Sequence, residues 1–207
     1  MKTYPVFALL EGVRVLVVGG GEVAERKAAA LIDAGALVQV VAREACEAMR
    51  TLETRGELKI ELRDYRAGEA AGYALTVAST DDAETNRQVA DDSRGAGRLV
   101  NVVDQPDLCN FIVPSVIRKG ELTIAISTGG ASPALSRRIR ERLEKEFPES
   151  MSQLIEVLGE FRARIMNTRR SFEERKKIMT DVVNSPEVDA FLSGDEGPLK
   201  ELLAKWI

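Results

Sequence analysis

Short apolar runs rich in β-branched residues alternate with amphipathic stretches through the first half of the chain. The runs have the length of buried strands, and apolar positions between them recur with the helical period. Strands that are apolar on both faces and alternate with helices are typical of a parallel sheet covered on both sides. The expected strands are residues 13–18, 36–41, 58–62, 73–79 and 98–103, and the expected helices are residues 22–34, 44–55 and 82–94.

The pattern changes after Pro106. Residues 111–128 (FIVPSVIRKGELTIAIST) contain two strand-like runs, which favour either an antiparallel hairpin or a strand pair that extends the sheet. From Ser132 onward the chain is almost entirely helical in pattern and rich in charge. Three prolines in this part are expected helix boundaries, namely Pro148, Pro186 and Pro198.

A glycine-rich break separates the first expected strand from the first helix. Residues 19–24 (GGGEVA) have the spacing G-x-G-x-x-A, which in this context is typical of dinucleotide binding by a Rossmann-like, doubly wound sheet. Gly19 would allow the tight turn, Gly21 would let the backbone approach a pyrophosphate, and the helix N-terminus would attract its charge. The alternative is a glycine-rich strand-to-helix turn without a ligand.

The residues after the second expected strand leave the choice of dinucleotide open. The acidic residue that binds the ribose 2′-hydroxyl of NAD is absent from its usual position, which is occupied by Arg43. Arg43 could bind a 2′-phosphate and favour NADP, or stack on adenine, while Glu44 could bind the ribose one residue later. Both residues could also be exposed charges at the start of a helix.

A second glycine turn, STGGASP (residues 127–133), connects a strand-like run to a strongly basic helix. Ser132 suits an N-cap, and Pro133 suits the first helical position. This local positive charge could bind a substrate with several carboxylates. The alternative is a capped surface helix whose arginines are balanced by glutamates.

Polar residues also follow the last two expected strands of the sheet. Ligands of open α/β sheets bind at the carboxyl ends of the strands, which makes Asp104 the best-placed carboxylate for catalysis. An Asp at this position is also a common turn residue. Thr80 is expected to line the cofactor cleft, and either Asp81 or Asp82 should cap the next helix.

Composition narrows the possible chemistry. The chain has 207 residues, 44% of them hydrophobic, and a net charge of −4, which argues against a nucleic-acid-binding protein. With no histidine, proton transfer would fall to Asp, Glu, Lys, Tyr or a substrate group. Cys46 and Cys109 form no disulfide or zinc pattern, so no metal site is expected and both are expected to be reduced thiols of a cytoplasmic protein. No apolar run is long enough for a membrane helix.

Four linked motifs resemble one known family. They are VVGGGEVAERKA (17–28), AST-DD (78–82), NVVDQPDLCNFIVPS (101–115) and ISTGGASPALSRRIRERLE (126–144). In order and spacing they are similar to the precorrin-2 dehydrogenases of sirohaem biosynthesis, including the N-terminal half of multifunctional bacterial sirohaem synthase. The similarity extends along the chain and is weakest after about residue 150.

The resemblance implies oxidation of precorrin-2, a tetrapyrrole with eight carboxylates, to sirohydrochlorin with NAD as cofactor. Some members also insert ferrous iron, and the resemblance leaves that activity open here. It implies a homodimer with the tetrapyrrole between its domains, and no membrane or nucleic-acid partner. Since residue 207 is the last and no methyltransferase domain is attached, separate enzymes are expected to supply precorrin-2. The implied parts are a Rossmann domain (1–113), a dimerisation region (114–147) and a C-terminal helical domain (148–207).

The resemblance also assigns candidate residues. Asp104 is the expected catalytic base. Thr128 stands where the family often has serine, which leaves any role that needs serine itself open. The competing interpretations are an NAD(H)-sensing module without turnover and a chelatase that does not oxidise its substrate. The expected cofactor-binding residues are Gly19, Gly21, Glu22, Val23, Arg43, Glu44 and Thr80, and the expected substrate-binding residues are Asn101, Ser127, Thr128, Gly129, Gly130, Ser132 and Arg137.

Overall fold

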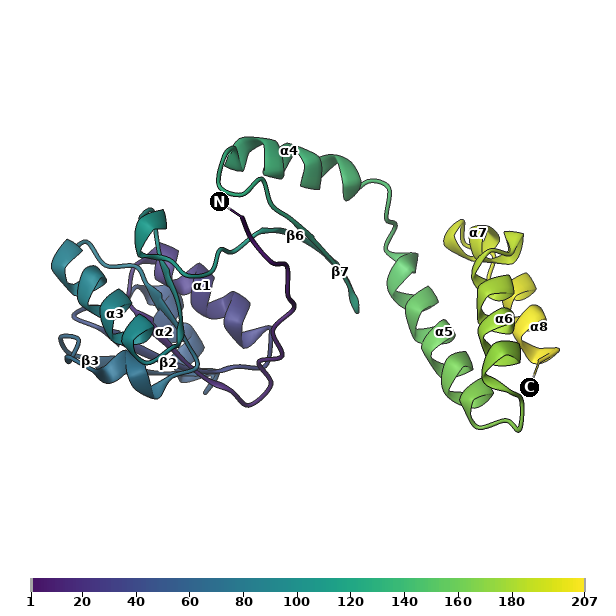
Figure 1. Ribbon diagram of the computed structural model, residues 1–207, viewed down its shortest axis with the longest axis horizontal. Coiled ribbons are helices and arrows are strands. Elements are labelled where there is room, and N and C mark those ends of the chain that lie inside the picture. Colours follow the sequence, from purple (N-terminus) through teal and green to yellow (C-terminus); the bar gives the residue numbers. More distant parts are fainter. Residues whose placement is uncertain (1, 207) are drawn as a thin grey trace. The chain divides into compact units, whose positions relative to one another are not determined.

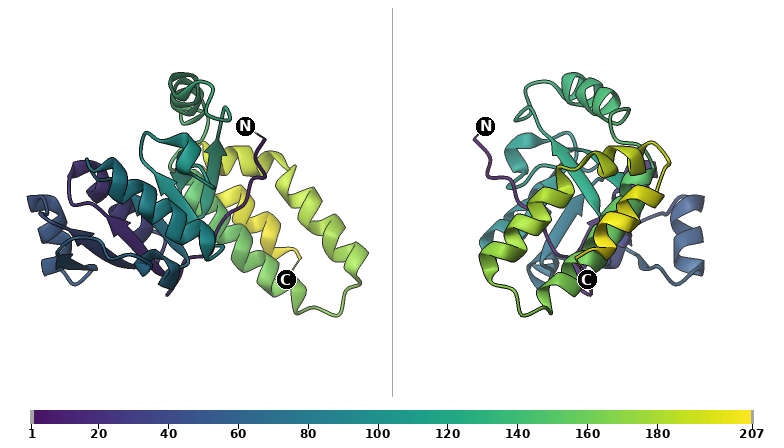
Figure 2. Two further views of the ribbon diagram at one scale, coloured as in Figure 1. Left: turned by 60° about the vertical axis from the view of Figure 1, so that its left-hand side comes forward. Right: turned by 90° about the vertical axis from the view of Figure 1, so that its right-hand side faces the viewer.

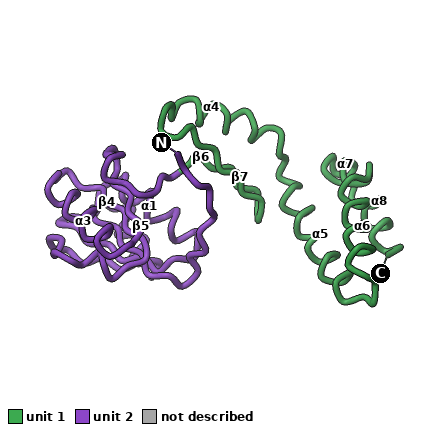
Figure 3. The backbone as a smooth tube through the Cα atoms, viewed as in Figure 1, with its two compact units in different colours: residues 1, 114–207 green, residues 2–113 purple. Residues whose placement is uncertain are grey.

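The computed structural model describes residues 2–206 and divides into two compact units. The first unit comprises residues 2–113, and the second begins at Pro114 (Figure 3). The first unit contains one sheet with helices packed against it (Figure 1). Its five strands are parallel and lie in the order β3-β2-β1-β4-β5. The strands are β1 (Arg14–Val18), β2 (Leu37–Ala42), β3 (Leu58–Leu62), β4 (Leu75–Ala78) and β5 (Leu99–Val102).

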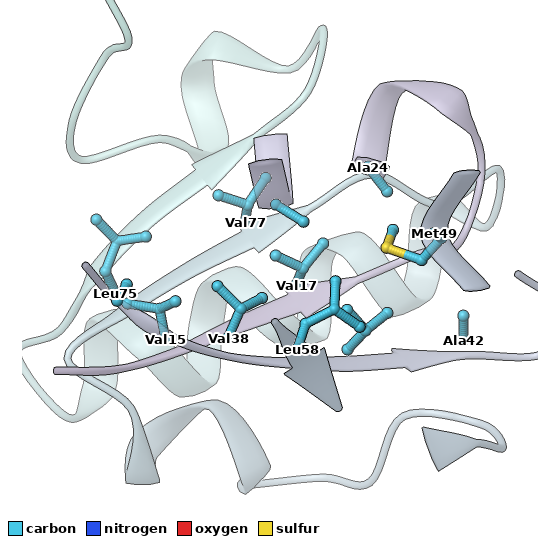
Figure 4. Packing of buried hydrophobic residues seen from close by; sticks show 12 residues of the cluster. Val15, Val17, Ala24, Val38, Ala42, Met49, Leu58, Leu75 and Val77 are labelled. Atoms are coloured by element: carbon cyan, nitrogen blue, oxygen red, sulfur yellow. The ribbon is translucent and has the colours of Figure 1, made fainter. Parts of the chain in front are cut away.

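Helices cover both faces of this sheet because its strands are apolar on both faces. Alternate residues of β1 point to opposite faces: Val15 and Val17 belong to one buried cluster, and Leu16 and Val18 to another. Figure 4 shows the first cluster, where strand residues pack against Ala24 and Met49. The Rossmann-like, doubly wound fold is therefore confirmed. The helices of this unit are α1 (Glu22–Ile32), α2 (Glu47–Thr54) and α3 (Ala83–Gly95), with short 3₁₀ helices η1 (Glu69–Gly72) and η2 (Pro106–Leu108).

Side chains close the sheet at β5. The backbone N–H of Val100 donates to the Asn110 side chain at 2.7 Å, and the Asn110 amide donates to the Arg98 carbonyl at 2.7 Å. The Cys109 thiol bonds to both the N–H and the carbonyl of Val102. Because these groups occupy the hydrogen-bonding positions of the β5 edge, no further strand from residues 2–206 pairs there.

The hairpin expected after this segment forms a sheet of its own. β6 (Ser115–Lys119) and β7 (Leu122–Ile126) pair antiparallel, with Ile117 opposite Ile124. The hairpin interpretation is confirmed, and the alternative, a strand pair that extends the sheet, is wrong because the edge at β5 is already closed.

The rest of the second unit is helical (Figures 1 and 2). Helices α5 to α8 share one apolar core. Phe161 and Phe191 are almost completely buried in it. Pro186 and Pro198 lie in the first turns of their helices, as expected. No helix within residues 2–206 combines the length and the apolar character that crossing a bilayer requires. The helices are α4 (Pro133–Leu143), α5 (Ser150–Met166), α6 (Phe172–Val183), α7 (Pro186–Leu192) and α8 (Gly197–Ala204).

Candidate functional site

A pocket of about 550 Å³ lies at the carboxyl edge of the parallel sheet. It includes the loops after β1 and β4, and between these two strands the strand order of the sheet changes direction. Ligands of open α/β sheets bind at this position because the loops on its two sides diverge and leave a crevice. The lining residues come from the segments that follow β1, β2, β3 and β4.

The glycine turn after β1 is tightly packed against the backbone of Ser79 and of Glu44. A Cβ atom on Gly19 would lie 2.3 Å from the Ser79 carbonyl oxygen, and the φ of Gly19 is +124°. A Cβ on Gly20 would lie 1.9 Å from the carbonyl oxygen of Glu44. Glycine is therefore required at both positions so that the ends of β2 and β4 can approach the turn. Gly20 has no assigned role in the sequence fingerprint, and only the packed structure gives it one.

Gly21 differs from its two neighbours because its Cβ would meet no protein atom within 4 Å. Gly21 is the N-cap of α1, and no side chain caps this helix. Glu22 is exposed and Val23 is half-buried at the first two helical positions. The first N–H groups of α1 therefore face an open space next to the pocket. Unpaired N–H groups at a helix N-terminus suit a pyrophosphate, so the residues present fit a dinucleotide.

Thr80 lines the pocket after β4 and is held by α3. Its hydroxyl donates to the Asn86 side-chain oxygen at 2.9 Å, and the Asn86 amide donates to the Thr80 carbonyl at 2.9 Å. Of the two expected helix caps, Asp82 is the one that accepts from the Glu84 N–H. Hydrogen bonds from Thr85 and Glu84 lower the pKa of Asp82. The buried Asn86 was not identified from the sequence, where it looks like an ordinary helix residue.

Arg43 and Glu44 line the pocket after β2. The Arg43 guanidinium donates to the carboxylate of Asp64, which follows β3. This hydrogen bond raises the pKa of Arg43. Asp64 and its neighbour Arg63 also line the pocket, and neither can be identified from a local sequence pattern.

Arg63 forms a bidentate salt bridge with Glu69, and this salt bridge fixes the loop after β3. Its guanidinium contacts both carboxylate oxygens of Glu69 and also binds Glu61. The side chains of Arg63 and Glu69 are only 19% and 16% exposed. The Arg63 guanidinium accordingly lowers the pKa of Glu69.

Replacing Glu69 with Gln is expected to lower the free energy of unfolding by about 1–2 kcal/mol at neutral pH, because Arg63 loses its ionised partner. The pKa of Glu69 is lower in the folded than in the unfolded state, so its contribution is complete above the unfolded pKa of about 4.3. It disappears as the pH falls through the folded value. Urea titrations of both proteins should therefore differ near neutral pH and converge in acid. Glu61→Gln is the control, with a smaller effect because Glu61 is 51% exposed.

Asp104 lies just beyond β5, at the same carboxyl edge as the pocket but outside its lining. Its side chain is exposed, and its φ of +58° makes it the one non-glycine residue with positive φ in the part of the chain that the structure describes. Asp tolerates this left-handed conformation better than most residues. Backbone conformations of this kind are concentrated at functional sites.

Asn101 precedes this turn and has a local structural contact. Its side-chain amide donates to the Phe111 carbonyl at 3.1 Å. The contact holds the segment that leads out of the first unit against β5.

The STGGASP turn in the second unit is closed by its own hydroxyl groups. The Ser127 hydroxyl accepts from the N–H of Gly129, and Ser132 caps α4 by accepting from Leu135 N–H. The Thr128 hydroxyl bonds to both the N–H and the carbonyl of Ser132. The expected N-cap is therefore confirmed, and Gly129 and Gly130 form the turn with φ values of +63° and +84°.

The basic helix α4 balances part of its charge internally. Arg137 and Arg140 pair with Glu141 and Glu144 one turn later, and the Arg137 side chain is 76% exposed. Residues 2–206 contain no cluster of three or more side chains suited to holding a metal ion.

Comparisons with known proteins agree with this geometry. The family model described as "Putative NAD(P)-binding" matches residues 6–115, and the model described as "Sirohaem biosynthesis protein central" matches residues 119–146. The siroheme synthase of Chromobacterium violaceum is 39% identical over 207 residues, which are 100% of this chain and 44% of that protein. The siroheme synthase of Pseudomonas fluorescens is 38% identical over 203 residues, with coverages of 98% and 44%. The chain thus spans less than half the length of these relatives.

Among solved structures, that of SirC, a precorrin-2 dehydrogenase, matches with a TM-score of 0.82 at 28% identity. The match covers 99% of this chain and 100% of that one. The resemblance based on the four sequence motifs is therefore confirmed. By the family model that matches residues 6–115, more than half of its length, the chain belongs to the family described as putative NAD(P)-binding.

Proposed function

We propose that this protein oxidises precorrin-2 to sirohydrochlorin with NAD. The observation that carries the proposal is the open glycine turn at the switch point of the sheet, in a chain that matches a precorrin-2 dehydrogenase over almost its entire length. The oxidation removes two hydrogens from the tetrapyrrole, one as hydride and one as a proton. NAD, when bound, supplies the hydride acceptor.

The residues of the glycine turn would bind the cofactor. Gly19 holds the turn tight, and the backbone of Gly21, Glu22 and Val23 supplies N–H groups for the pyrophosphate. Arg43 and Glu44, which line the same pocket, would lie on the adenosine side, and Thr80 would line the cleft.

Asp104 would accept the proton, since the chain contains no histidine and this exposed carboxylate lies at the ligand-binding edge of the sheet. Its left-handed backbone conformation supports a functional role because most side chains would be strained there.

We further propose that the second unit binds substrate carboxylates and forms the dimer. The turn from Ser127 to Ser132 opens a helix with exposed arginines, including Arg137, which suits a polyanionic tetrapyrrole. Within the turn, the backbone N–H of Gly130 is the proposed contact, because the Thr128 hydroxyl and the Gly129 N–H are already used internally. Asn101 would act by holding the segment beside Asp104. In this proposal residues 114–147 are the dimerisation region and residues 148–207 a helical domain.

The proposed reaction belongs in the cytoplasm, where thiols such as Cys46 and Cys109 stay reduced. Ferrous iron would enter only as a second substrate, after the oxidation. The competing class is an NAD(H)-sensing module, which would bind the dinucleotide without reducing it.

Anaerobic incubation of the purified protein with precorrin-2 and NAD tests the proposal. Absorbance is followed for NADH and for the sirohydrochlorin chromophore, and ferrous iron is added afterwards. We expect NADH and sirohydrochlorin to appear in equal amounts. NAD binding without turnover would instead indicate a sensor, and a protein-dependent shift to sirohaem after iron addition would establish a second activity.

A further inference from the structure

The loop after β3 bears on the choice between NAD and NADP, a question that rests on the proposed function. Arg43 occupies the position after β2 where NADP-binding sheets often place an arginine for the 2′-phosphate. From the sequence alone, Arg43 is therefore compatible with NADP. The structure gives this arginine a different partner, because its Nε donates to the carboxylate of Asp64.

The pairing of β2 with β3 brings these two side chains together. Ala42 lies opposite Leu62 in the parallel ladder, and the Arg63 N–H donates to the Ala42 carbonyl at 2.9 Å. Arg43 and Asp64 leave the sheet from these neighbouring ends. Their side chains are 73% and 72% exposed, and an ion pair so exposed contributes little to folding stability. Its effect on the charge of the pocket is therefore the more important one.

Arg63, the second cationic side chain in the pocket lining, is also paired with carboxylates. Arg63 binds Glu69 through both of its carboxylate oxygens and binds Glu61 as well. Its guanidinium is thus committed to the fold and does not offer a free charge to a ligand.

The pocket lining as a whole is acidic. It contains two guanidiniums, both paired, and four carboxylates. Asp82, one of the four, has a lowered pKa because it accepts hydrogen bonds from Thr85 and Glu84, so it remains ionised at neutral pH. A 2′-phosphate with a charge of about −2 would enter this field, whereas a ribose 2′-hydroxyl is neutral. The carboxylates are those of Glu44, Asp64, Asp81 and Asp82.

We propose that Asp64 is a specificity-determining residue that makes this pocket select NAD over NADP. Asp64 neutralises Arg43, and a phosphate that used the remaining donors of that guanidinium would lie beside the Asp64 carboxylate. The like charges repel each other and cancel the attraction of the arginine. A ribose hydroxyl meets no such repulsion. It can accept a hydrogen bond from the Arg43 guanidinium or donate one to the Glu44 carboxylate.

Direct titration with NAD and with NADP, by calorimetry and without substrate, tests the proposal. The wild-type protein is expected to bind NADP at least about tenfold more weakly than NAD. Asp64→Asn removes the charge and frees Arg43, so the dissociation constant of NADP should fall at least about tenfold while that of NAD changes less than about threefold. Asp181→Asn is the matched control, since it breaks an exposed Lys177–Asp181 pair in the second unit and should change neither constant.

Two further variants test whether Arg43 carries the effect. In Asp64→Asn/Arg43→Gln the gained NADP affinity should disappear, because the freed guanidinium is gone. In Arg43→Gln alone, the ratio of the NADP to the NAD dissociation constant should not rise more than about threefold, because the paired arginine attracts little phosphate in the wild type. This second variant keeps the test informative if Asp64→Asn does not fold.

The outcomes separate the two proposals. Binding of neither dinucleotide by the wild type would reject the proposed function. Equal wild-type affinities, an unchanged NADP constant in Asp64→Asn, or a large rise of the NADP to NAD ratio in Arg43→Gln would each overturn the role of Asp64 while leaving NAD-dependent oxidation intact.

Discussion

Asp104→Asn is expected to lower the rate of NAD-dependent precorrin-2 oxidation by about a hundredfold, the lower end of the usual effect of a general base. Asparagine has nearly the same shape and tolerates the left-handed backbone conformation that Asp104 adopts at φ +58°. The turn after β5 should therefore be preserved, and only the proton acceptor is lost. The affinity for NAD should be unchanged, because Asp104 does not line the pocket.

Single-turnover kinetics under anaerobic conditions, with NAD affinity measured in parallel, checks this prediction. Asp107→Asn is the matched control, because it removes another exposed carboxylate from the same loop. A rate for Asp104→Asn equal to that of the control would exclude Asp104 from the chemistry. A loss of folded protein would instead assign the residue to the turn.

Gly21→Val should weaken NAD binding by about thirtyfold or more, because its side chain would occupy the space in which the backbone approaches the pyrophosphate. The φ of Gly21 is −78°, an ordinary value for valine, and the new Cβ would meet no protein atom within 4 Å. The cost to stability should therefore stay within about 1 kcal/mol, the usual penalty for a poor N-cap.

Calorimetric titration with NAD, together with thermal unfolding, measures both quantities. Gly72→Val is the control, since Gly72 is exposed and equally open but lies in η1. Gly19→Ala should behave differently from both, because its Cβ would collide with the Ser79 carbonyl and the fold itself would suffer. An unaltered NAD constant in Gly21→Val would show that the turn has only a structural role.

The strands of the first unit could be predicted from the sequence because their apolar patterns are local. The expected strand at residues 58–62 coincides with β3. The second helix was expected from residue 44 but begins at Glu47. The difference has a tertiary cause, since Glu44 presents its carbonyl to Gly20 and the Cys46 N–H donates to the carbonyl of Gly20. A contact between turns that are far apart in the sequence cannot be predicted from a local sequence pattern.

Some residues of the site could not be predicted from the sequence, again because their roles depend on tertiary contacts. Arg43 and Thr80 were found because they follow predicted strands, whereas Asp64 becomes relevant only through the register of β2 and β3. Asn101 and Thr128 looked available from the sequence, yet both bond to nearby backbone. The break between α5 and α6 was also missed, although the S-x-x-E signature of Ser171 and Glu174 forms a capping box there.

Both edges of the parallel sheet carry side-chain hydrogen bonds, which bears on how copies of the protein can associate. At β5, Asn110 and Cys109 occupy the edge, and at β3 the outward N–H of Ile60 donates to Glu53 at 2.9 Å. Lys59 adds a charge at the β3 edge. Edge strands blocked in this way resist the edge-to-edge pairing that leads to aggregation. Ordered self-assembly of this protein is therefore expected to use surfaces other than the edges of the nucleotide-binding sheet.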